Sequence, residues 1–358
     1  MSKKMTMQEA ITEAKRCLNC SRPLCRTGCP IENNIPEFVR ALSEGNIGNA
    51  YETIAERSNL PAICGRVCAH EKQCEAHCIL AKKNSAISIG SLEMFIADFA
   101  HEYGLNPVPP STGKRGKVAV IGSGPAGLTV AGDLAKMDFA VTIFEGQPEP
   151  GGVLLFGIPE FRLEKEVVRR EINILRKLGV EIVTEKLIGP DMTVDDLFAQ
   201  GYDAIFMGTG TALPRTLDIP GQELSGILTA TYFLKVVVLA DSGKLDKKEV
   251  LIHDDDDVVV IGAGNVAIDA ARTAIRRTSG NVTVLYHKTA EDMTCLPSEY
   301  EAALKEGVQF KFLKKPLGYL NKKQMRALTN TRAKASPADE TELAGLLVQN
   351  IVKDPEGK

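Results

Sequence analysis

The chain has 358 residues, of which 44% are hydrophobic and 25% are charged, and its formal net charge is −3. This length predicts two or three domains with a large core. Because neither the whole chain nor any local run is strongly basic, nucleic-acid binding is not expected. No apolar run reaches the ~18 residues of a membrane span, and no apolar signal segment opens the chain, so a cytoplasmic protein without membrane attachment is expected.

Eight of the nine cysteines lie within the first 105 residues, in two groups. In a chain without an export signal, so many cysteines indicate metal or redox sites rather than disulfides. The first group has the spacing C-x2-C-x4-C-x3-C-P, and the second has C-x3-C-x5-C-x3-C. The first group is Cys17, Cys20, Cys25 and Cys29, and the second is Cys64, Cys68, Cys74 and Cys78.

Two groups of four thiols predict two four-ligand metal centres, and soft sulfur ligands favour iron–sulfur clusters or zinc. A cysteine followed by proline at the end of such a run is typical of two-cluster ferredoxins, in which that cysteine ligates the other cluster. We therefore expect two [4Fe–4S] clusters, with zinc or free thiols as alternatives. Amphipathic segments predict helices at 35–43, 47–57 and 88–103, and the Pro/Gly-rich stretch 104–116 predicts a domain boundary.

A strand–helix–strand pattern between residues 117 and 144 contains a dinucleotide-binding fingerprint. Gly122 permits the tight turn, Gly124 permits close approach of a pyrophosphate, and Gly127 permits close packing of helix on strand. The helix N-terminus offers free N–H groups to phosphates. Glu145 ends the second strand, where an acid accepts hydrogen bonds from a ribose. Together these features predict dinucleotide binding.

Two later glycine turns extend this prediction. Gly151-Gly152 follows the fingerprint as a flexible turn that lies against a bound ring, the alternative being an ordinary loop. A helix is expected at 165–178, with strands at 180–184 and 202–207. Gly208-Thr209-Gly210 directly follows the last strand and is expected to close over the dinucleotide, although a simple turn has the same pattern.

A second fingerprint follows an apolar strand that begins at Val258. Gly262 and Gly264 match its first two positions, and Ala267 takes the third. A helix at 266–277 and a strand at 282–285 follow. The strand ends in Tyr286-His287-Lys288, where the first unit has an acid. Because an acid repels a ribose 2′-phosphate, its absence beside a cation favours NADP(H), the alternative being a solvated strand end. The isolated Cys295 is expected to be structural.

These motifs resemble one known family. The segments CLNCSRPLCRTGCP, VIGSGPAGL, PGGVLLFGIPEFRL and VVVIGAGNVAIDAARTA resemble the small (β) subunit of bacterial NADPH-dependent glutamate synthase. The amino-terminal part of dihydropyrimidine dehydrogenase and the large subunit of NADH-dependent ferredoxin:NADP⁺ oxidoreductase are related. The resemblance implies an α/β chain in which a helical two-cluster iron–sulfur domain precedes two Rossmann-like nucleotide-binding domains. The expected domains are 1–105 for the clusters, 106–226 for FAD and 227–358 for NADP(H).

The resemblance also implies binding residues. One cluster would use Cys17, Cys20, Cys25 and Cys78, and the other would use Cys29, Cys68, Cys74 and Glu93, with Cys64 left as a non-ligand. FAD would be held by Gly122, Gly124, Gly127, Glu145, Gly152 and Gly210. NADPH would be held by Gly262, Gly264, Asn265, Ala267 and Arg272, with His287 and Lys288 where the family often has two arginines. Since neither replaces the arginine fork, only a modest NADPH preference is expected.

The implied function is electron transfer from NADPH through FAD and two [4Fe–4S] clusters to a partner. That partner is expected to be the larger glutamate synthase subunit or another redox subunit. The alternatives are a component of a bifurcating ferredoxin:NADP⁺ oxidoreductase and a docking subunit without a competent flavin site. No side chain is expected to be catalytic, because the cofactors perform the chemistry. The family returns to its FAD domain through a Gly-Asp-containing segment, and no Gly-Asp pair follows Gly264. The FAD domain is therefore expected to lack this return segment and to bind FAD weakly.

Overall fold

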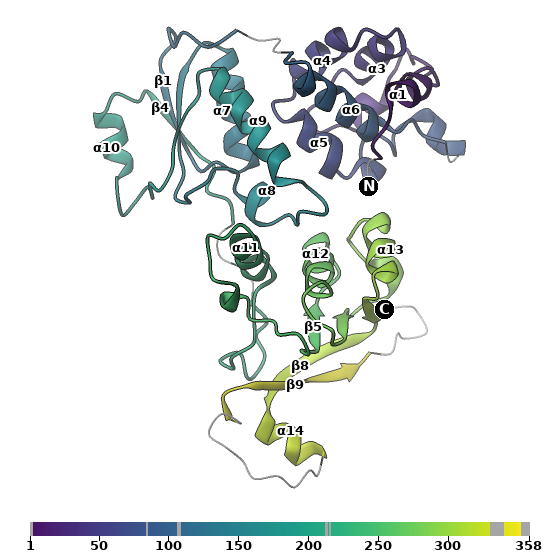
Figure 1. Cartoon of the computed structure of the whole chain (residues 1–358), viewed down its shortest axis with the longest axis vertical. Helices are drawn as coiled ribbons and strands as arrows, with labels where there is room; N and C mark the ends of the chain where they lie inside the picture. Colours follow the sequence, from purple (N-terminus) through teal and green to yellow (C-terminus); the bar gives the residue numbers. More distant parts are fainter. Residues whose placement is uncertain are drawn as a thin grey trace. The chain divides into compact units, whose positions relative to one another are not determined.

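The computed structural model describes residues 3–83, 85–105, 109–211, 214, 216–329 and 340–351. The chain forms two compact units, Met1–Gly210 and Thr211–Lys358. The first unit contains a helical part followed by a parallel sheet, and the second contains another parallel sheet and a two-stranded antiparallel sheet (Figure 1).

Six α-helices and two short 3-10 helices form the described helical part of the first unit. They are α1 (Met7–Ala14), α2 (Leu24–Thr27), α3 (Ile35–Ser43), α4 (Ile47–Ala55), α5 (Pro61–Val67), η1 (His70–Lys72), η2 (Ile79–Lys83) and α6 (Ile89–Glu102). The helices predicted at 35–43, 47–57 and 88–103 are confirmed as α3, α4 and α6, with small shifts at their ends. A reciprocal capping box between Thr6 and Glu9 fixes the start of α1.

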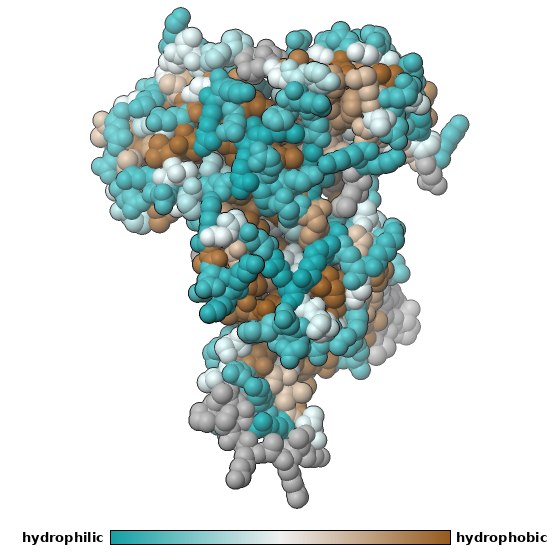
Figure 2. All heavy atoms as spheres, in the orientation of Figure 1, coloured by the Kyte–Doolittle hydropathy of each residue, from teal (hydrophilic) through white to brown (hydrophobic). Residues whose placement is uncertain are grey.

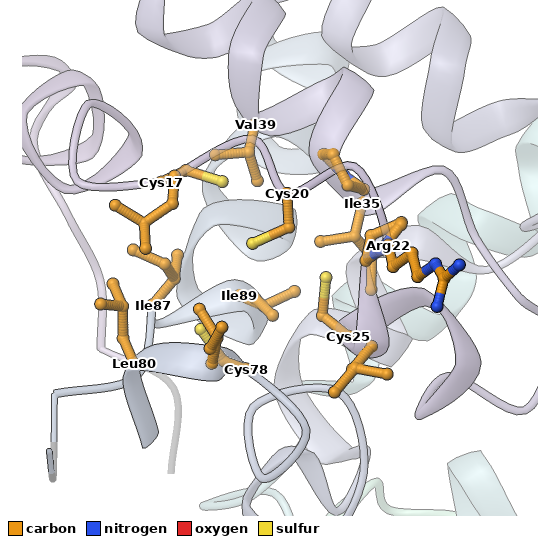
Figure 3. A pocket seen from close by; sticks show the side chains of 15 residues that line it. Cys17, Cys20, Arg22, Cys25, Ile35, Val39, Cys78, Leu80, Ile87 and Ile89 are labelled. Atoms are coloured by element: carbon orange, nitrogen blue, oxygen red, sulfur yellow. The ribbon is translucent and has the colours of Figure 1, made fainter. Parts of the chain in front are cut away.

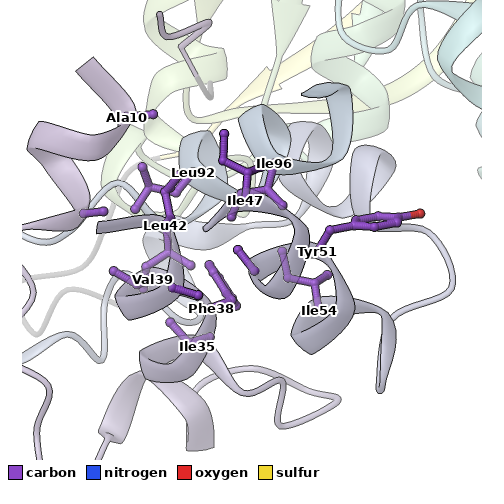
Figure 4. Packing of buried hydrophobic residues seen from close by; sticks show 14 of the residues in the cluster. Ala10, Ile35, Phe38, Val39, Leu42, Ile47, Tyr51, Ile54, Leu92 and Ile96 are labelled. Carbon is purple, nitrogen blue, oxygen red and sulfur yellow. The ribbon is translucent and has the colours of Figure 1, made fainter. Parts of the chain in front are cut away.

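The core of this helical part is a cluster of mostly aliphatic side chains, with Phe38 and Tyr51, contributed mainly by α1, α3, α4 and α6 (Figure 4). Phe38 and Leu42 on α3 are four residues apart, so both face inward from one side of that helix. Ile54, Leu92 and Ile96 complete the centre, and all five are at most 1% exposed. Each such burial contributes about 1.5–3 kcal/mol, which holds the cysteine-bearing loops on a rigid base.

The second half of the first unit is a four-stranded parallel sheet with the order β3-β2-β1-β4. Its elements are β1 (Lys117–Ile121), α7 (Pro125–Lys136), β2 (Ala140–Phe144), α8 (Val153–Phe156), α9 (Lys165–Lys177), β3 (Glu181–Val183), α10 (Val194–Ala199) and β4 (Ala204–Met207). Ala119 and Ile121 face the cluster that includes Leu197 of α10, whereas α7 contacts β1, β2 and α9. The continuous apolar run of β1 follows from burial on both faces.

The helical part and the sheet part of this unit are joined by buried polar contacts. Arg66 on α5 donates to Asp98 on α6 at 2.9 Å and to Glu164, at the start of α9, at 3.0 Å. Asn59 donates to Asp133 on α7 at 2.6 Å. Because these contacts connect α5 and α6 to α7 and α9, the cysteine loops and the first fingerprint belong to one packed body.

The second unit contains a three-stranded parallel sheet with the order β5-β6-β7 and an antiparallel pair, β8-β9. Its elements are α11 (Ala230–Asp241), η3 (Lys247–Glu249), β5 (Val258–Ile261), α12 (Asn265–Ala274), β6 (Val282–Leu285), η4 (Ala290–Asp292), α13 (Pro297–Lys305), β7 (Gln309–Lys311), β8 (Lys314–Asn321), α14 (Lys322–Thr329) and β9 (Leu343–Asn350). Strand β6 has the predicted bounds.

Helix α12 ends earlier than predicted, at Ala274 rather than 277. Thr278 and Ser279 donate side-chain hydrogen bonds to the carbonyls of Asp256 and Asp254, at 2.7 Å and 2.5 Å. These bonds hold the chain in a turn that is incompatible with a longer helix. Elements β8 and α14 were not predicted, because their polar sequences lack a clear apolar period.

No helix in the described part of the chain is long and apolar enough to span a membrane. The visible surface is mostly hydrophilic, with separate apolar areas between charged side chains (Figure 2).

Candidate cofactor-binding sites

The first cysteine site is a pocket in the helical part of the first unit. It is lined by Cys17, Cys20, Cys25 and Cys78, and its walls include Ile35, Val39, Ile87 and Ile89 (Figure 3). Cys78 lies 53 residues beyond Cys25 in the sequence, and the fold brings it to the other three. The four thiols that the family resemblance grouped together therefore surround one cavity.

The pKa of the Cys25 thiol is raised to about 11, mainly by burial. A backbone hydrogen bond opposes this increase, and the neighbouring Cys17, Cys78 and Cys20 add smaller increases. The pKa of Cys17 is raised for the same main reason. Four thiolates in this pocket thus require a bound cation to remain ionised, and coordination to a metal supplies that charge. An apolar-walled cavity with four soft donors fits a [4Fe–4S] cluster.

The second cysteine site is more deeply buried. Cys74 is 6% exposed, and burial raises the pKa of its thiol, with further increases from the charges of Glu75, Glu93 and Cys29. Glu93 on α6 is buried as well, and desolvation raises the pKa of its carboxyl well above the usual range. The structure therefore brings Cys29, Cys74 and Glu93 close enough to interact electrostatically.

Cys64 lies near this second site, although the resemblance leaves it as a non-ligand. Its thiol interacts with that of Cys68, the residue that caps the C-terminus of α5, and Ser58 Oγ lies 4.0 Å from its sulfur. The interaction with Cys68 and burial raise the pKa of the Cys64 thiol, and the Ser58 hydroxyl opposes this increase. Among the described residues, no three His, Cys, Asp or Glu side chains are close enough to hold a single metal ion.

The first nucleotide site lies where β1 meets α7. Gly122 has φ +96°, and a Cβ there would lie 2.5 Å from the carbonyl oxygen of Gly208. A Cβ on Gly127 would lie 1.9 Å from the carbonyl oxygen of Gly122, so only glycine fits. At Gly124, by contrast, a Cβ would meet no described atom within 4 Å. This open backbone at the N-terminus of α7 is a cradle that fits a pyrophosphate.

Glu145 is held in place at this site. It is 8% exposed, and its carboxylate accepts hydrogen bonds from Ser123 N at 3.0 Å, Ser123 Oγ at 2.5 Å and Gln147 N at 2.8 Å. A carboxylate offers about four acceptor positions, so one remains for a ribose hydroxyl. Ser123, which sequence reasoning did not single out, is the residue that orients this acid. The only sequence signal for it is a hydroxyl between two fingerprint glycines.

The glycine turns after the fingerprint are part of the same site. Ser123 Oγ accepts a hydrogen bond from Gly151 N at 2.9 Å, and a Cβ on Gly152 would lie 2.7 Å from Gly124 Cα. Gly210 has φ +70° and follows β4, beside the Gly208 carbonyl that packs on Gly122. The predicted FAD residues of the first unit are therefore neighbours in space.

Lys165 is a second residue that sequence reasoning missed at this site. It is 6% exposed, and its Nζ donates to the carbonyl of Leu154 at 3.1 Å and to that of Ile158. Both carbonyls belong to the segment that follows Gly152. The buried ammonium therefore fixes the conformation of this segment, and no sequence pattern distinguishes it from a surface lysine.

The second nucleotide site repeats the strand–turn–helix geometry between β5 and α12. Gly262 has φ +121°, and Gly264 is the N-cap of α12. Asn265 Oδ1 accepts a hydrogen bond from Leu296 N at 2.9 Å, which connects the fingerprint to the segment before α13. A Cβ on Gly262 would lie 3.8 Å from the Ala267 Cβ, so alanine fits this third position.

The other predicted NADPH residues differ in exposure. His287 and Lys288 are exposed after β6, whereas Tyr286 is buried and donates to the carbonyl of Asp292 at 2.9 Å. Arg272 is 3% exposed, and its guanidinium donates to Glu299 at 2.5 Å and to Glu306 at 2.7 Å. These contacts hold α12 against α13 and favour a structural role for Arg272.

Comparison with known proteins extends these observations. Residues 1–105 match the family described as dihydropyrimidine dehydrogenase domain II, 4Fe-4S cluster, and residues 116–348 match the pyridine nucleotide-disulphide oxidoreductase family. FprA from Mycobacterium tuberculosis is 19% identical, with a TM-score of 0.50 over 68% of this chain and 66% of that chain, and shares the fold.

Other relatives match most of this chain and part of their own length. The glutamate synthase [NADPH] small chain of Halomonas elongata is 37% identical over 335 residues, which cover 93% of this chain and 71% of that protein. The Escherichia coli small chain is 37% identical over 313 residues, covering 87% of this chain and 66% of that protein. The NADP(+)-dependent formate dehydrogenase subunit beta of Moorella thermoacetica is 31% identical and is matched over 47% of its length.

The chain thus combines a 4Fe-4S domain with nucleotide-binding domains of the FAD and NAD(P)H type, and it belongs to the family of the small chain of NADPH-dependent glutamate synthase.

Proposed function

We propose that this chain passes electrons from NADPH, through FAD and two [4Fe–4S] clusters, to a larger partner subunit, as a glutamate synthase small subunit. One observation carries the proposal: a pocket of four cysteines and a dinucleotide fingerprint with a buried acid lie within a single packed unit. A bound flavin supplies the change from two-electron to one-electron transfer that must stand between a nicotinamide and iron–sulfur clusters.

In this proposal the residues of the chain bind and orient the cofactors. Cys17, Cys20, Cys25 and Cys78 are the proposed ligands of one cluster, and Cys29, Cys68, Cys74 and Glu93 are those of the other. Gly122, Gly124, Gly127, Glu145, Gly152 and Gly210 are proposed to hold FAD. Gly262, Gly264, Asn265, Ala267, His287 and Lys288 are proposed to hold NADPH, and Arg272 supports the helix that carries this site.

Metal and flavin analysis of the anaerobically purified chain tests this proposal. We expect about eight irons, four for each of two clusters, and an FAD absorption spectrum that bleaches when NADPH is added. Stoichiometric zinc with negligible iron would refute the cluster assignment. Iron without any NADPH-dependent bleaching would leave an electron-transfer subunit without a competent flavin site.

The role of Glu93 is tested separately. Oxygen ligation tunes a cluster differently from sulfur ligation, so Glu93→Ala is expected to change the EPR spectrum and the potential of one cluster, or to lower the iron content. Glu75→Gln is the matched control. Glu75 lies near the same site, but its carboxylate accepts the Gly90 N–H at 3.0 Å at the start of α6. If iron, EPR and potentials are all unchanged in Glu93→Ala, Glu93 is not a ligand.

The identity of the partner forms the second part of the proposal. The relative named as a formate dehydrogenase subunit favours a second candidate, electron delivery to a different redox subunit. NADPH oxidation is to be measured with a glutamate synthase large subunit added, with and without glutamine and 2-oxoglutarate. Oxidation that depends on both substrates supports the glutamate synthase assignment. Flavin bleaching without such oxidation supports the second candidate.

A further inference from the structure

We propose that the surface around the first cysteine site is a docking face for an acidic redox protein, which takes one electron at a time from this chain. We define the docking face by its apolar residues, Leu18, Leu24 and Ile79, and by its cations, Lys15, Arg16, Arg22, Arg26, Lys82 and Lys83. The inference rests on the proposed function, because it takes Cys17, Cys20, Cys25 and Cys78 as cluster ligands. The step forms no bond: the acceptor gains one electron, and the reduced iron–sulfur site loses it.

The apolar part of the docking face is exposed directly beside the cysteines. Leu18, Leu24 and Ile79 are 60%, 53% and 48% exposed, and all three line the pocket that holds the four thiols. Single exposed leucines are common, but large aliphatic side chains gathered around one pocket mark an interaction site. A partner that covers them would exclude water and lie next to the cysteine site.

The charged residues of the docking face all carry positive charge. Between Lys15 and Thr27 there are four cations and no acid, and between Cys78 and Lys83 there are two cations and no acid. Arg22 lines the pocket, and its guanidinium points away from the cysteines (Figure 3). A cationic rim around an apolar centre is complementary to a partner with an acidic rim, and such fields steer association at low salt.

Two acids, Glu13 and Glu32, lie near the docking face and are outnumbered by its six cations. Glu13 is already paired with Arg16, whose Nη1 donates to its carboxylate at 2.7 Å. Arg16 Nη2 also donates to the carbonyl of Ser85 at 2.5 Å, which connects the end of α1 to the segment after η2. Glu32 is exposed, and Arg26 Nε donates to its backbone carbonyl at 3.2 Å. The rim therefore keeps a net positive charge, and hydrogen bonds hold Arg16 and Arg26 in place.

The second cysteine site is more deeply buried than the first. Cys74 is 6% exposed and Glu93 is 9% exposed. Ala62 N, on the helix α5 that ends just before Cys68, donates to Glu171 on α9 at 3.3 Å. Helix α9 also carries Lys165, which holds the segment after Gly152 at the proposed flavin site. The second site is thus the inner one, toward the sheet part, and the first site is the one at the surface. Electrons entering from the flavin side would leave through the docking face.

The test compares two acceptors that differ in charge alone. Cytochrome c is basic, and its succinylated form carries the same haem on an acidic surface. The anaerobic 358-residue protein is reduced with dithionite, so that neither FAD nor NADPH is needed, and excess dithionite is removed by gel filtration because it reduces cytochrome c directly. Cytochrome reduction is then followed by stopped flow. At low ionic strength we expect the succinylated form to react about tenfold faster than the native form, and this difference is expected to disappear at high salt.

Charge reversal on the chain sharpens the test. Lys82→Glu/Lys83→Glu is expected to reverse the order of the two cytochromes, whereas Lys247→Glu/Lys248→Glu, an exposed pair in the second unit, is expected to keep it. Leu18→Ser/Leu24→Ser is expected to slow both acceptors, with the iron content unchanged. Full iron with equal rates for both cytochromes, or with no response to Lys82→Glu/Lys83→Glu, overturns the docking face. Absent iron refutes the cluster assignment instead.

Discussion

The two nucleotide-binding fingerprints of this chain have the same spacing but different packing. In the first unit a Cβ on Gly127 would lie 1.9 Å from the Gly122 carbonyl oxygen, so α7 packs against the turn with no room for a side chain. In the second unit the third position is Ala267, and a Cβ on Gly262 would still be 3.8 Å from its Cβ. The same sequence motif therefore imposes a strict steric requirement in one unit and a loose one in the other.

The ends of the second strands differ in the same way. Glu145 follows β2, is buried, and accepts three hydrogen bonds from Ser123 and Gln147. The equivalent end of β6 has the buried Tyr286 and then two exposed basic residues, His287 and Lys288. The first unit therefore holds a fixed hydrogen-bond acceptor at this position, whereas the second has exposed basic side chains there. The shared motif therefore specifies the turn and the start of the helix in both units, whereas the residues that follow the neighbouring strand differ between them.

The largest predicted effect tests the packing difference. Gly127→Ala is expected to destabilise the first unit by about 3 kcal/mol, the upper end of the usual cost of overpacking, because the added methyl meets backbone. FAD should be lost with it. Ala267→Gly is the matched control and should cost only about 0.5–1 kcal/mol, through backbone entropy. Melting temperature and FAD content measure both, and equal losses in the two variants would contradict the comparison.

The next effect concerns the buried acid. Glu145→Ala removes the acceptor of two buried N–H groups, and leaving such a donor unpaired costs about 1–3 kcal/mol. We also expect FAD affinity to fall at least about tenfold, because a hydrogen bond to a charged group is lost. Fluorescence titration of FAD measures this. Ser123→Ala keeps the carboxylate and should have a smaller effect; unchanged FAD affinity in Glu145→Ala would exclude the acid from the site.

A smaller effect is expected at the exposed end of β6. The chain should prefer NADPH over NADH modestly, and Lys288→Glu should erase or reverse that preference by replacing an attractive charge with a repulsive one. Since exposed charge interactions contribute about 0.2–1 kcal/mol, the change in the ratio of KM values should be a few-fold. Lys305→Glu, the same charge change on α13, is the control. A wild-type preference for NADH would refute this interpretation of the second site.

The smallest effect is a pH dependence in the second unit. Burial raises the pKa of Glu306, but hydrogen bonds from Arg276 and Arg272 outweigh it and lower the pKa to about 2. An acid with a lowered pKa in the folded state stabilises it above the unfolded pKa of about 4.3, and this contribution is lost as the pH falls toward 2. Glu306→Gln should therefore destabilise α12 and α13 most near pH 6–7 and progressively less below about pH 4.3.

Hydrogen exchange of the α12 and α13 peptides measures this dependence. Glu301→Gln, at an exposed position of α13, is the control and should leave their exchange unchanged across the same range. A cost of Glu306→Gln that is as large at pH 3 as at pH 7 would show that the ion pairs with Arg272 and Arg276 are not its source.

The sequence alone determined the local elements and their motifs. Continuous apolar runs predicted β1, β2 and β6, because a strand buried on both faces needs apolar side chains in succession. The glycine spacing predicted the two strand–turn–helix units, since glycine permits the tight turn between strand and helix. The cysteine spacing predicted metal chemistry, although it did not by itself separate Cys78 from its neighbours in the second group.

Tertiary structure decided which distant residues meet. It brought Cys78 to Cys17, Cys20 and Cys25 around one pocket. It also gave Ser123 and Lys165 their roles, because a hydrogen bond to a residue far along the chain leaves no periodic signal in the sequence. Arg272 was predicted among the residues of the NADPH site, and its burial against Glu299 follows from the packing of α12 on α13. Local pattern thus specified each element, whereas long-range packing specified what each side chain contacts.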